Sequence, residues 1–233
     1  MVCSNSSIDV DRLVALVPMR HHSERVEDKN YRPFAGKPLY HHILASLLAC
    51  SLISEVAVDT DSQIISEDVS EQFPQIRLID RPEHLRAGTV SMNKVLLHDV
   101  SQLEADYYVQ THSTNPLLRT ETISRAIQLF LDSRSTYDSL FSTTKLQVRL
   151  WDNQTRPVNH DPAILLRTQD LPPIYEENSC FYIFSEETLV KRQNRIGKRP
   201  LLFEIDRWEA WDIDEELDFE IAEYLYLKYR QEK

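Results

Sequence analysis

Five cationic side chains follow a short apolar segment near the beginning of the chain. The apolar segment covers residues 13–17, and the cations are Arg20, Arg25, Lys29, Arg32 and Lys37. Phosphates in α/β proteins are commonly bound where a buried strand runs into a loop at the carboxyl edge of the sheet. This loop has no glycine before Gly36, although backbone phosphate cradles usually depend on glycine. If it binds phosphate, side chains make the contacts, and the candidates are Arg20, Ser23, Arg25, Lys29 and Asn30. The alternative is a solvated loop whose cations pair with Glu24, Glu27 and Asp28.

Two carboxylates near the C-terminus are spaced for a metal ion. Asp212 and Asp214 flank Ile213, and in an extended segment residues i and i+2 face the same side. Oxygen ligands at this spacing suit Mg²⁺ held between protein carboxylates and substrate phosphates. The alternative is that Asp214 caps the last helix and that Asp212 is merely exposed.

Polar side chains at two further strand ends are candidates for binding a polyhydroxylated substrate. Residues 110–119 contain Gln110, His112 and Thr114, and they lead from a strand through a turn into a helix. We expect them at the same sheet edge as the cationic loop, although Ser, Thr, Asn and Pro also build ordinary turns. Asn178 stands at the entrance to the apolar segment 181–184. Cys180 beside it is interpreted as a small buried hydrophobe rather than a nucleophile, because nothing near it marks a general base.

Apolar periodicity predicts the elements that position these residues. Strands are predicted at residues 13–17, 56–58, 76–79, 107–110 and 181–184, and helices over residues 39–50, 62–73, 91–103, 120–130 and 215–229. This alternation predicts an α/β fold with a doubly wound, mostly parallel sheet. The alternation stops near residue 138, and residues 152–173 are polar and interrupted by four prolines. We interpret residues 139–175 as an excursion from the main sheet, such as a hairpin arm.

Composition excludes several classes of function. The 233 residues carry 26 Lys and Arg against 37 Asp and Glu, a formal net charge of −11, which argues against binding to nucleic acid or to an anionic membrane. No apolar run approaches the ~20 residues that span a bilayer, and the polar tail of residues 1–10 lacks the apolar core of a signal peptide. Three isolated cysteines fit a cytoplasmic location. Three glycines exclude a Gly-rich P-loop. We expect one domain over residues 11–233.

Taken in order, these motifs resemble the CMP-sugar synthetases, the acylneuraminate cytidylyltransferase family. The resemblance runs from about Leu13 to Tyr224. The family's Arg-Gly-Gly-Ser-Lys-type loop, which closes on Lys-Asn, matches Arg20, Ser23, Lys29 and Asn30. Later motifs of the family match Thr60-Asp61 and residues 81–85 with Ser91. The next match covers residues 113–117, with Arg119 one residue late. The last two matches are Asn178 to Tyr182, with serine in place of glycine, and Asp212 to Phe219, unchanged.

The resemblance implies a nucleotide-diphospho-sugar transferase-like fold and a Mg²⁺-dependent cytidylyltransferase. CTP would lie over the first loop with its phosphates on Arg20, Ser23, Arg25 and Lys29, while Asn30, Arg81 and Ser91 would contact the nucleotide. A 2-keto-3-deoxy sugar acid of the nonulosonate type would contact Gln110, His112, Thr114 and Asn178. Asp212 and Asp214 would hold Mg²⁺, and the catalytic residues would be Arg20, Arg25, Lys29 and Asp214. The excursion at residues 139–175 would be the family's dimerisation arm, so a homodimer is expected.

The chain departs from the family pattern in its first loop. His21 and His22 replace paired glycines, and Glu24 reverses the charge of a lysine, for which we expect Arg25 to substitute. His112 replaces a glutamine, and Gln110 lies two residues earlier. Two alternatives therefore stay open. One is a nucleotidyltransferase of the same fold with a different acceptor, such as a sugar phosphate or another phosphorylated small molecule. The other is a catalytically silent nucleotide-binding relative.

Overall fold

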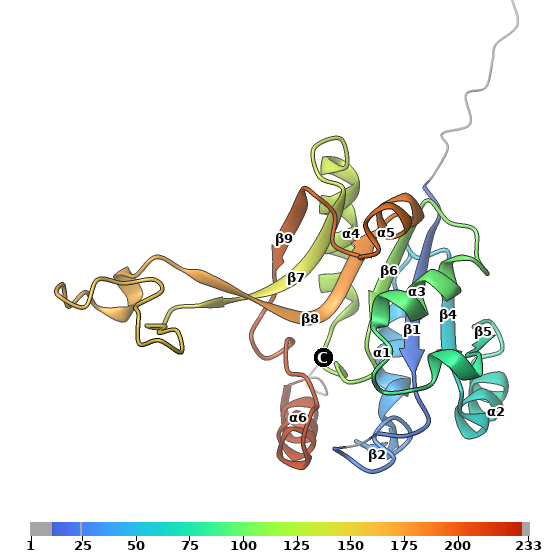
Figure 1. Ribbon diagram of the computed structural model, residues 1–233. Helices are drawn as coiled ribbons and strands as arrows, with labels where there is room; N and C mark the ends of the chain where they lie inside the picture. Colours follow the sequence, from blue (N-terminus) through green and yellow to red (C-terminus); the bar gives the residue numbers. More distant parts are fainter. Residues whose placement is uncertain (1–10, 24, 230–233) are drawn as a thin grey trace, which may run out of the picture.

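A seven-stranded sheet forms the centre of the part of the chain that the structure describes, residues 11–23 and 25–229 (Figure 1). The computed structural model orders the strands β5-β4-β1-β6-β8-β7-β9. Strand β8 runs antiparallel to both of its neighbours, and all other neighbouring strands are parallel. The polar tail 1–10, with Cys3, and Glu24 lie outside the described residues. The bounds are β1 Leu13–Met19, β4 Glu55–Thr60, β5 Arg77–Asp80, β6 Tyr107–Thr111, β7 Ser139–Leu146, β8 Ile174–Phe184 and β9 Pro200–Glu204.

Helices cover both faces of this sheet, as the apolar sequence of β1 requires. All seven residues of β1 are buried, and a strand buried on both faces is apolar throughout instead of alternating. Leu13, Ala15 and Val17 face the helices α1, α2 and α4, while Val14 and Leu16 face α3 and α5. The mostly parallel, doubly wound α/β fold is thereby confirmed. The helices are α1 Leu39–Leu48, α2 Gln63–Gln72, α3 Met92–Val100, α4 Thr120–Ser133, α5 Glu186–Arg192 and α6 Glu216–Tyr229.

Helix α5 and strand β9 have no counterpart in the sequence expectations. Helix α5 has seven residues, too few for a clear helical period. Strand β9 has five residues at the edge of the sheet, next to β7. The pairing of β9 with Ser139–Thr143 places the first residues of the expected excursion inside the main sheet.

A two-stranded arm leaves the sheet beyond Thr143. We call residues 144–176 the arm; within it Thr144, Lys145 and Leu146 pair with Glu176, Tyr175 and Ile174. Figure 1 shows the arm projecting away from the rest of the chain, in yellow and orange. It carries exposed apolar side chains, among them Trp151, Val158, Ile164 and Leu165, the last of which is 89% exposed.

None of the helices within residues 11–23 and 25–229 is both long and apolar enough to cross a membrane.

Candidate active site

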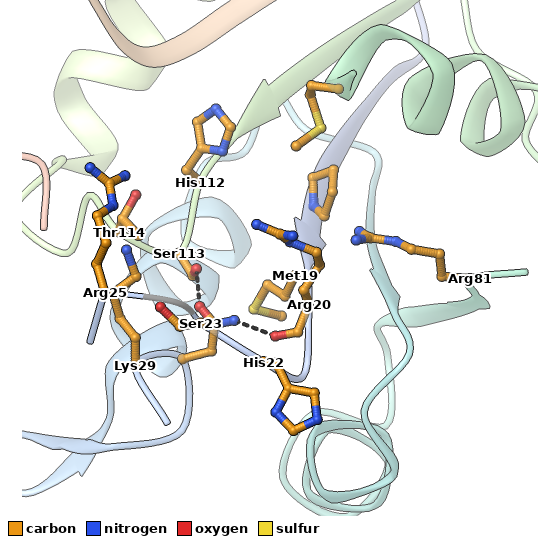
Figure 2. Close-up of a pocket in the computed structure, with 13 residues that line it drawn as sticks. Met19, Arg20, His22, Ser23, Arg25, Lys29, Arg81, His112, Ser113 and Thr114 are labelled. Atoms are coloured by element: carbon orange, nitrogen blue, oxygen red, sulfur yellow. Dashed lines mark hydrogen bonds between the residues drawn. The ribbon is translucent and has the colours of Figure 1, made fainter. Parts of the chain in front are cut away.

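A cavity of about 230 Å³ opens at the carboxyl ends of β1 and β6. Its wall includes four cationic side chains, those of Arg20, Arg25, Lys29 and Arg81. Figure 2 shows Arg20 and Arg81 approaching from one side of the cavity and Lys29 and Arg25 standing on the other. The remaining lining residues are Pro18, Met19, His22, Ser23, Asn30, Met92, His112, Ser113 and Thr114. The structure thus brings the cationic loop and the turn after β6 together, as the order of the parallel strands predicts.

Hydrogen bonds close the cationic loop on itself and on the turn after β6. Asn30 donates from Nδ2 to the carbonyl oxygen of Arg20 at 2.7 Å. The Ser113 hydroxyl donates to Oδ1 of Asn30 at 2.6 Å. Figure 2 marks both bonds with dashed lines. Asn30 lines the cavity, but its amide holds the loop in shape.

The replacement of the paired glycines causes no backbone strain at His21 or His22. Neither residue has a positive φ, whereas Asp28 and Ala35, further along the loop, adopt the left-handed conformation with φ 55° and 47°. The backbone N–H of His21 donates to Oδ1 of Asp61 at 2.7 Å, and its ring Nδ1 lies 2.8 Å from the Ser62 hydroxyl. Side-chain and backbone contacts of His21 therefore fix the loop to the end of β4.

Arg81 reaches the cavity from a buried position. Its side chain is 2% exposed, and Nε donates to both carboxylate oxygens of Asp59 at 3.0 and 3.1 Å. Asp99, on α3, lies against Asp59 and is also buried. Burial, followed by the neighbouring Asp59 carboxylate, raises the pKa of Asp99 to about 9. We assign the shared proton to Asp99, because the guanidinium of Arg81 stabilises the charge on Asp59.

The segment 212–214 lies between this cavity and a second one. The second cavity, of about 350 Å³, is lined by Thr144, Glu176, Glu177, Asn178, Ser179, Arg207, Ala210, Trp211, Asp212 and Asp214. The cationic loop contacts this segment directly: Arg25 Nη2 donates to Oδ1 of Asp214 at 2.5 Å, and Lys29 Nζ donates to the carbonyl oxygen of Ile213 at 2.6 Å. The two carboxylates therefore face the acidic cavity while their backbone adjoins the cationic one.

The charged groups of Lys29 and Asp212 are both partly desolvated. Burial lowers the pKa of Lys29, although the carboxylates of Asp212 and Asp214 oppose this shift. Burial also raises the pKa of Asp212, and a hydrogen bond from the Thr114 side chain works in the opposite direction. Thr114 thus supports Asp212, and its own carbonyl oxygen accepts from the backbone N–H of Ile213 at 3.1 Å.

Asp214 does not cap the last helix. Helix α6 begins at Glu216, and the carboxylate of Asp218 accepts from the backbone N–H groups of Asp214 and Glu215 at 3.1 and 2.9 Å. The side chain of Asp214 is therefore available to Arg25 and to the second cavity. The alternative interpretation of Asp214 as a helix cap is wrong.

An ion pair between Arg119 and the buried carboxylate of Glu209 anchors the segment that leads to Asp212 and Asp214. Glu209 is fully buried and accepts from Arg119 Nε at 2.8 Å and from the Thr122 hydroxyl at 3.0 Å. These bonds tie the stretch after β9 to the start of α4. Arg119 consequently has a structural role rather than a position at either cavity.

The donor set of Asp212 and Asp214 fits Mg²⁺. Mg²⁺ in phosphoryl-transfer sites is commonly held by one or two carboxylates, with water and substrate phosphates completing the shell. Two carboxylates facing one cavity beside a cationic phosphate-type loop meet that requirement. Residues 11–23 and 25–229 contain no cluster of three or more His, Cys, Asp and Glu able to hold a metal by themselves. A metal ion here would therefore depend on substrate oxygens.

The remaining expected site residues differ in their access to the cavities. His112 lines the first cavity, and Asn178 lines the second, where it also joins β7 to β8 by accepting from the Ser142 hydroxyl at 2.6 Å. Ser91 is exposed and lines neither cavity. Gln110 is fully buried and lines neither cavity; its amide lies 3.1 Å from Nε2 of His112. The Gln110 amide thus contacts His112, and a direct contact of Gln110 with substrate stays a prediction.

Arg195 contacts the expected site residue Gln110, a contact for which the sequence offered no signal. It lies in the loop between α5 and β9, and its Nη1 donates to Oε1 of Gln110. Its guanidinium carbon also stands 3.5 Å from the centre of the Tyr182 ring. Arg195 and Gln110 are 85 positions apart, and both α5 and β9 escaped sequence prediction, so no local pattern could have joined them.

Comparisons with known proteins identify relatives of this chain. The family model described as Cytidylyltransferase matches residues 14–232. N-acylneuraminate cytidylyltransferase A of Danio rerio is 25% identical over 92% of this chain, which spans about half (51%) of that protein. CMP-N,N'-diacetyllegionaminic acid synthase of Legionella pneumophila is 29% identical over 92% of this chain and 96% of its own length. Pseudaminic acid cytidylyltransferase of Campylobacter jejuni is 24% identical over 91% of this chain and 95% of its own length.

Solved structures share the fold at lower identity. A CMP:2-keto-3-deoxy-manno-octonic acid synthetase complexed with CTP superposes with a TM-score of 0.70 at 16% identity, covering 93% of this chain and 99% of that one. A 4-diphosphocytidyl-2C-methyl-D-erythritol synthase from Anaerococcus prevotii gives 0.69 at 12% identity, covering 97% and 100%. With the family model matched over nearly the whole length, the chain belongs to the cytidylyltransferase family of CTP-dependent nucleotidyltransferases.

Proposed function

We propose that this chain transfers CMP from CTP to the anomeric hydroxyl of a 2-keto-3-deoxy sugar acid of the nonulosonate type. In this reaction the hydroxyl oxygen loses its proton and forms a bond to the α-phosphorus. The bond from that phosphorus to the bridging oxygen breaks, and pyrophosphate leaves. Such chemistry depends on positioning and charge neutralisation more than on a covalent nucleophile.

The observation that carries the proposal is the contact between the two cavities. Arg25 and Lys29 of the cationic cavity bond to Asp214 and to the backbone of Ile213 at the edge of the acidic one. A triphosphate on Arg20, Ser23, Arg25 and Lys29 would then have its α-phosphorus near an acceptor held by Thr114, Asn178 and their neighbours. Relatives named for CMP-legionaminate, pseudaminate and N-acylneuraminate synthesis support a nonulosonate as that acceptor.

Asp212 and Asp214 would hold Mg²⁺ between the two substrates. The ion would neutralise phosphate charge and help to orient the leaving group. The chain's own cations act on the same charge: Arg20 and Arg25 offer planar pairs of donors, and Lys29 offers a compact ammonium whose lowered pKa follows from its burial. Arg81, aligned by Asp59, presents its guanidinium to the nucleotide.

A second copy of the chain is the partner that we propose for the arm. Its apolar side chains Trp151, Val158, Ile164 and Leu165 are between 52% and 89% exposed. Such a surface favours association, and a homodimer built through residues 139–175 would bury it. The cytoplasmic location of this chain stays a prediction.

A pyrophosphate-release screen tests the proposed reaction. Purified protein is incubated with Mg²⁺, each of the four nucleoside triphosphates, and a panel of keto-sugar acids, sugar 1-phosphates and other phosphorylated small molecules. We expect release only with CTP and a 2-keto-3-deoxy sugar acid, and none from the Asp212→Asn variant. Release with a phosphorylated acceptor instead would establish the different-acceptor alternative. Absence of release with every pair would leave the silent nucleotide-binding relative.

A further inference from the structure

A chain of three polar side chains leads from the core to the wall of the cationic cavity. Arg195 donates from Nη1 to Oε1 of Gln110, and Nε2 of Gln110 lies 3.1 Å from Nε2 of His112. Gln110 is fully buried, and His112 lines the cavity at the end of β6 (Figure 2).

At the core end of this series of side chains, two further contacts hold Arg195 in place. The guanidinium of Arg195 stacks on the ring of Tyr182 at 3.5 Å, and its backbone N–H donates to Oδ1 of Asn93 at 3.3 Å. Tyr182 is the direct neighbour of Gln110 across the β6–β8 pairing. The sheet register therefore sets the position of Arg195 relative to Gln110, and a loop 85 residues away in sequence completes the site.

The rules of hydrogen bonding leave one orientation for the Gln110 amide. A guanidinium can only donate, so the Gln110 atom that faces Arg195 is its oxygen. The amide nitrogen then faces the carbonyl oxygen of Thr111 at 2.9 Å, which can only accept. Two independent neighbours thus agree on where the amide N–H groups lie, and one of those N–H groups points at Nε2 of His112.

A nitrogen that accepts a hydrogen bond cannot carry a proton of its own. Because Gln110 donates to Nε2 of His112, the neutral ring must carry its hydrogen on Nδ1. Protonation of Nε2 would set two donors against each other at 3.1 Å. Burial, together with the nearby charges of Arg195 and Lys29, lowers the pKa of His112 to about 3, in agreement with a neutral ring.

We propose that Arg195 and Gln110 fix His112 as the Nδ1–H tautomer, which makes His112 an uncharged hydrogen-bond donor to an oxygen atom of the bound substrate. The proposal rests on the proposed function for the identity of that substrate. Among the residues that the structure describes, none hydrogen-bonds to Nδ1 of His112. A neutral donor suits a hydroxyl or carbonyl oxygen of the acceptor, because charge for the phosphates is already supplied by Arg20, Arg25 and Lys29. Arg195 and Gln110 are positioning residues in this scheme.

The tautomer is measured on the free protein by NMR. Two-bond ¹H–¹⁵N correlation spectra of ¹⁵N-histidine-labelled protein at pH 7 distinguish the two tautomers and the imidazolium. The chain has eight histidines, so the His112 signals are assigned by their loss in His112→Gln. We expect a protonated Nδ1 and an unprotonated Nε2. An Nε2–H tautomer or an imidazolium in the wild type would overturn the proposal.

Two variants test the positioning residues. Gln110→Glu keeps an oxygen for Arg195 but has no N–H, so His112 is expected to move its proton to Nε2 and donate to the carboxylate. Arg195→Met removes one of the two constraints on the amide and is expected to give a mixture of tautomers, with Arg195→Lys restoring the single form. Arg199→Met is the matched control, because Arg199 is exposed in the same loop and its side chain makes no hydrogen bond within the described residues. An unchanged Nδ1–H pattern in Gln110→Glu would refute the role of Gln110. An unchanged Nδ1–H pattern in a folded Arg195→Met variant would refute the role of Arg195.

Acceptor kinetics test the donor role separately. His112→Phe is expected to lower kcat/KM for the sugar acid about tenfold, the effect of one lost hydrogen bond, and His112→Gln, which keeps an N–H, is expected to lose less. Equal losses in both variants would count against the donor role. Because the NMR measurement requires no substrate, its outcome is independent of whether the proposed transfer reaction is observed.

Discussion

The Asp59–Asp99 pair makes the free energy of unfolding depend on pH, and the substitution Asp99→Asn should remove this dependence. Asp99 is buried against Asp59, and within the described residues neither of its carboxylate oxygens faces a hydrogen-bond donor. Two carboxylates in contact require a shared proton, and burial with the Asp59 charge raises the pKa of Asp99 from 3.8 to about 9. Asn at position 99 would imitate the protonated acid, because its amide can donate to Asp59.

The sign and size of the effect follow from proton linkage. Between pH 3.8 and about pH 9 the folded state holds the proton on Asp99 and the unfolded state does not. The free energy of unfolding therefore falls with rising pH, by about 1.4 kcal/mol per pH unit from this group. The stabilisation that this proton provides is fully present below the pKa of Asp99 in the unfolded chain, and it is lost as the pH rises through the pKa of Asp99 in the folded protein. Asp99→Asn removes this contribution, so the free energy of unfolding of the variant, relative to that of the wild type, should rise by about 3 kcal/mol between pH 6 and pH 8.

Urea unfolding at several pH values between 6 and 8 measures the difference. Contributions of other titrating groups cancel when the variant is subtracted from the wild type at each pH. Asp80→Asn is the matched control, because the Asp80 side chain is 88% exposed, and its curve is expected to run parallel to the wild type. If the Asp99→Asn curve also ran parallel to the wild type, Asp99 would not hold a proton in the folded protein and the argument would fail.

Four further predictions concern the site, its anchor and the arm. Asp214→Asn should lower kcat in the pyrophosphate assay about 10²- to 10³-fold at an unchanged melting temperature; full activity would remove the proposed metal role. Arg25→Ala should raise the KM for CTP about tenfold if Arg25 binds phosphate, and unchanged affinity would refute that role. Glu209→Ala leaves the Arg119 charge without its buried partner, and urea unfolding should detect a loss of about 3 kcal/mol; a loss below 1 kcal/mol would contradict the anchor. Leu165→Asp should yield a monomer in sedimentation experiments if the arm joins two copies, whereas an unchanged mass would exclude this contact.

Local sequence patterns were sufficient for most of the elements. The apolar segment 13–17 lies within β1, and helical spacing after Pro38 lies in α1, because burial on both faces or on one stripe leaves a period in the sequence. The patterns failed for α5 and β9, which are short and half exposed. Their failure also concealed Arg195, which lies in the loop between them.

The sequence by itself determined which residues can do chemistry. The cations after β1 and the pair Asp212 and Asp214 are recognisable from residue type and spacing, because both can be read without knowledge of tertiary contacts. Their order along the chain was also enough to predict the cytidylyltransferase family, whose model matches residues 14–232.

Only the tertiary structure decided which of these residues meet and in what state. Arg25 and Asp214 are 189 positions apart, yet their side chains touch, and the buried amide of Gln110 lies 3.1 Å from Nε2 of His112. The proton on Asp99 and the neutral ring of His112 follow from burial and from neighbours on other elements. Contacts between distant segments and the loss of water around a group arise only when the chain folds, so no local pattern in the sequence can record them.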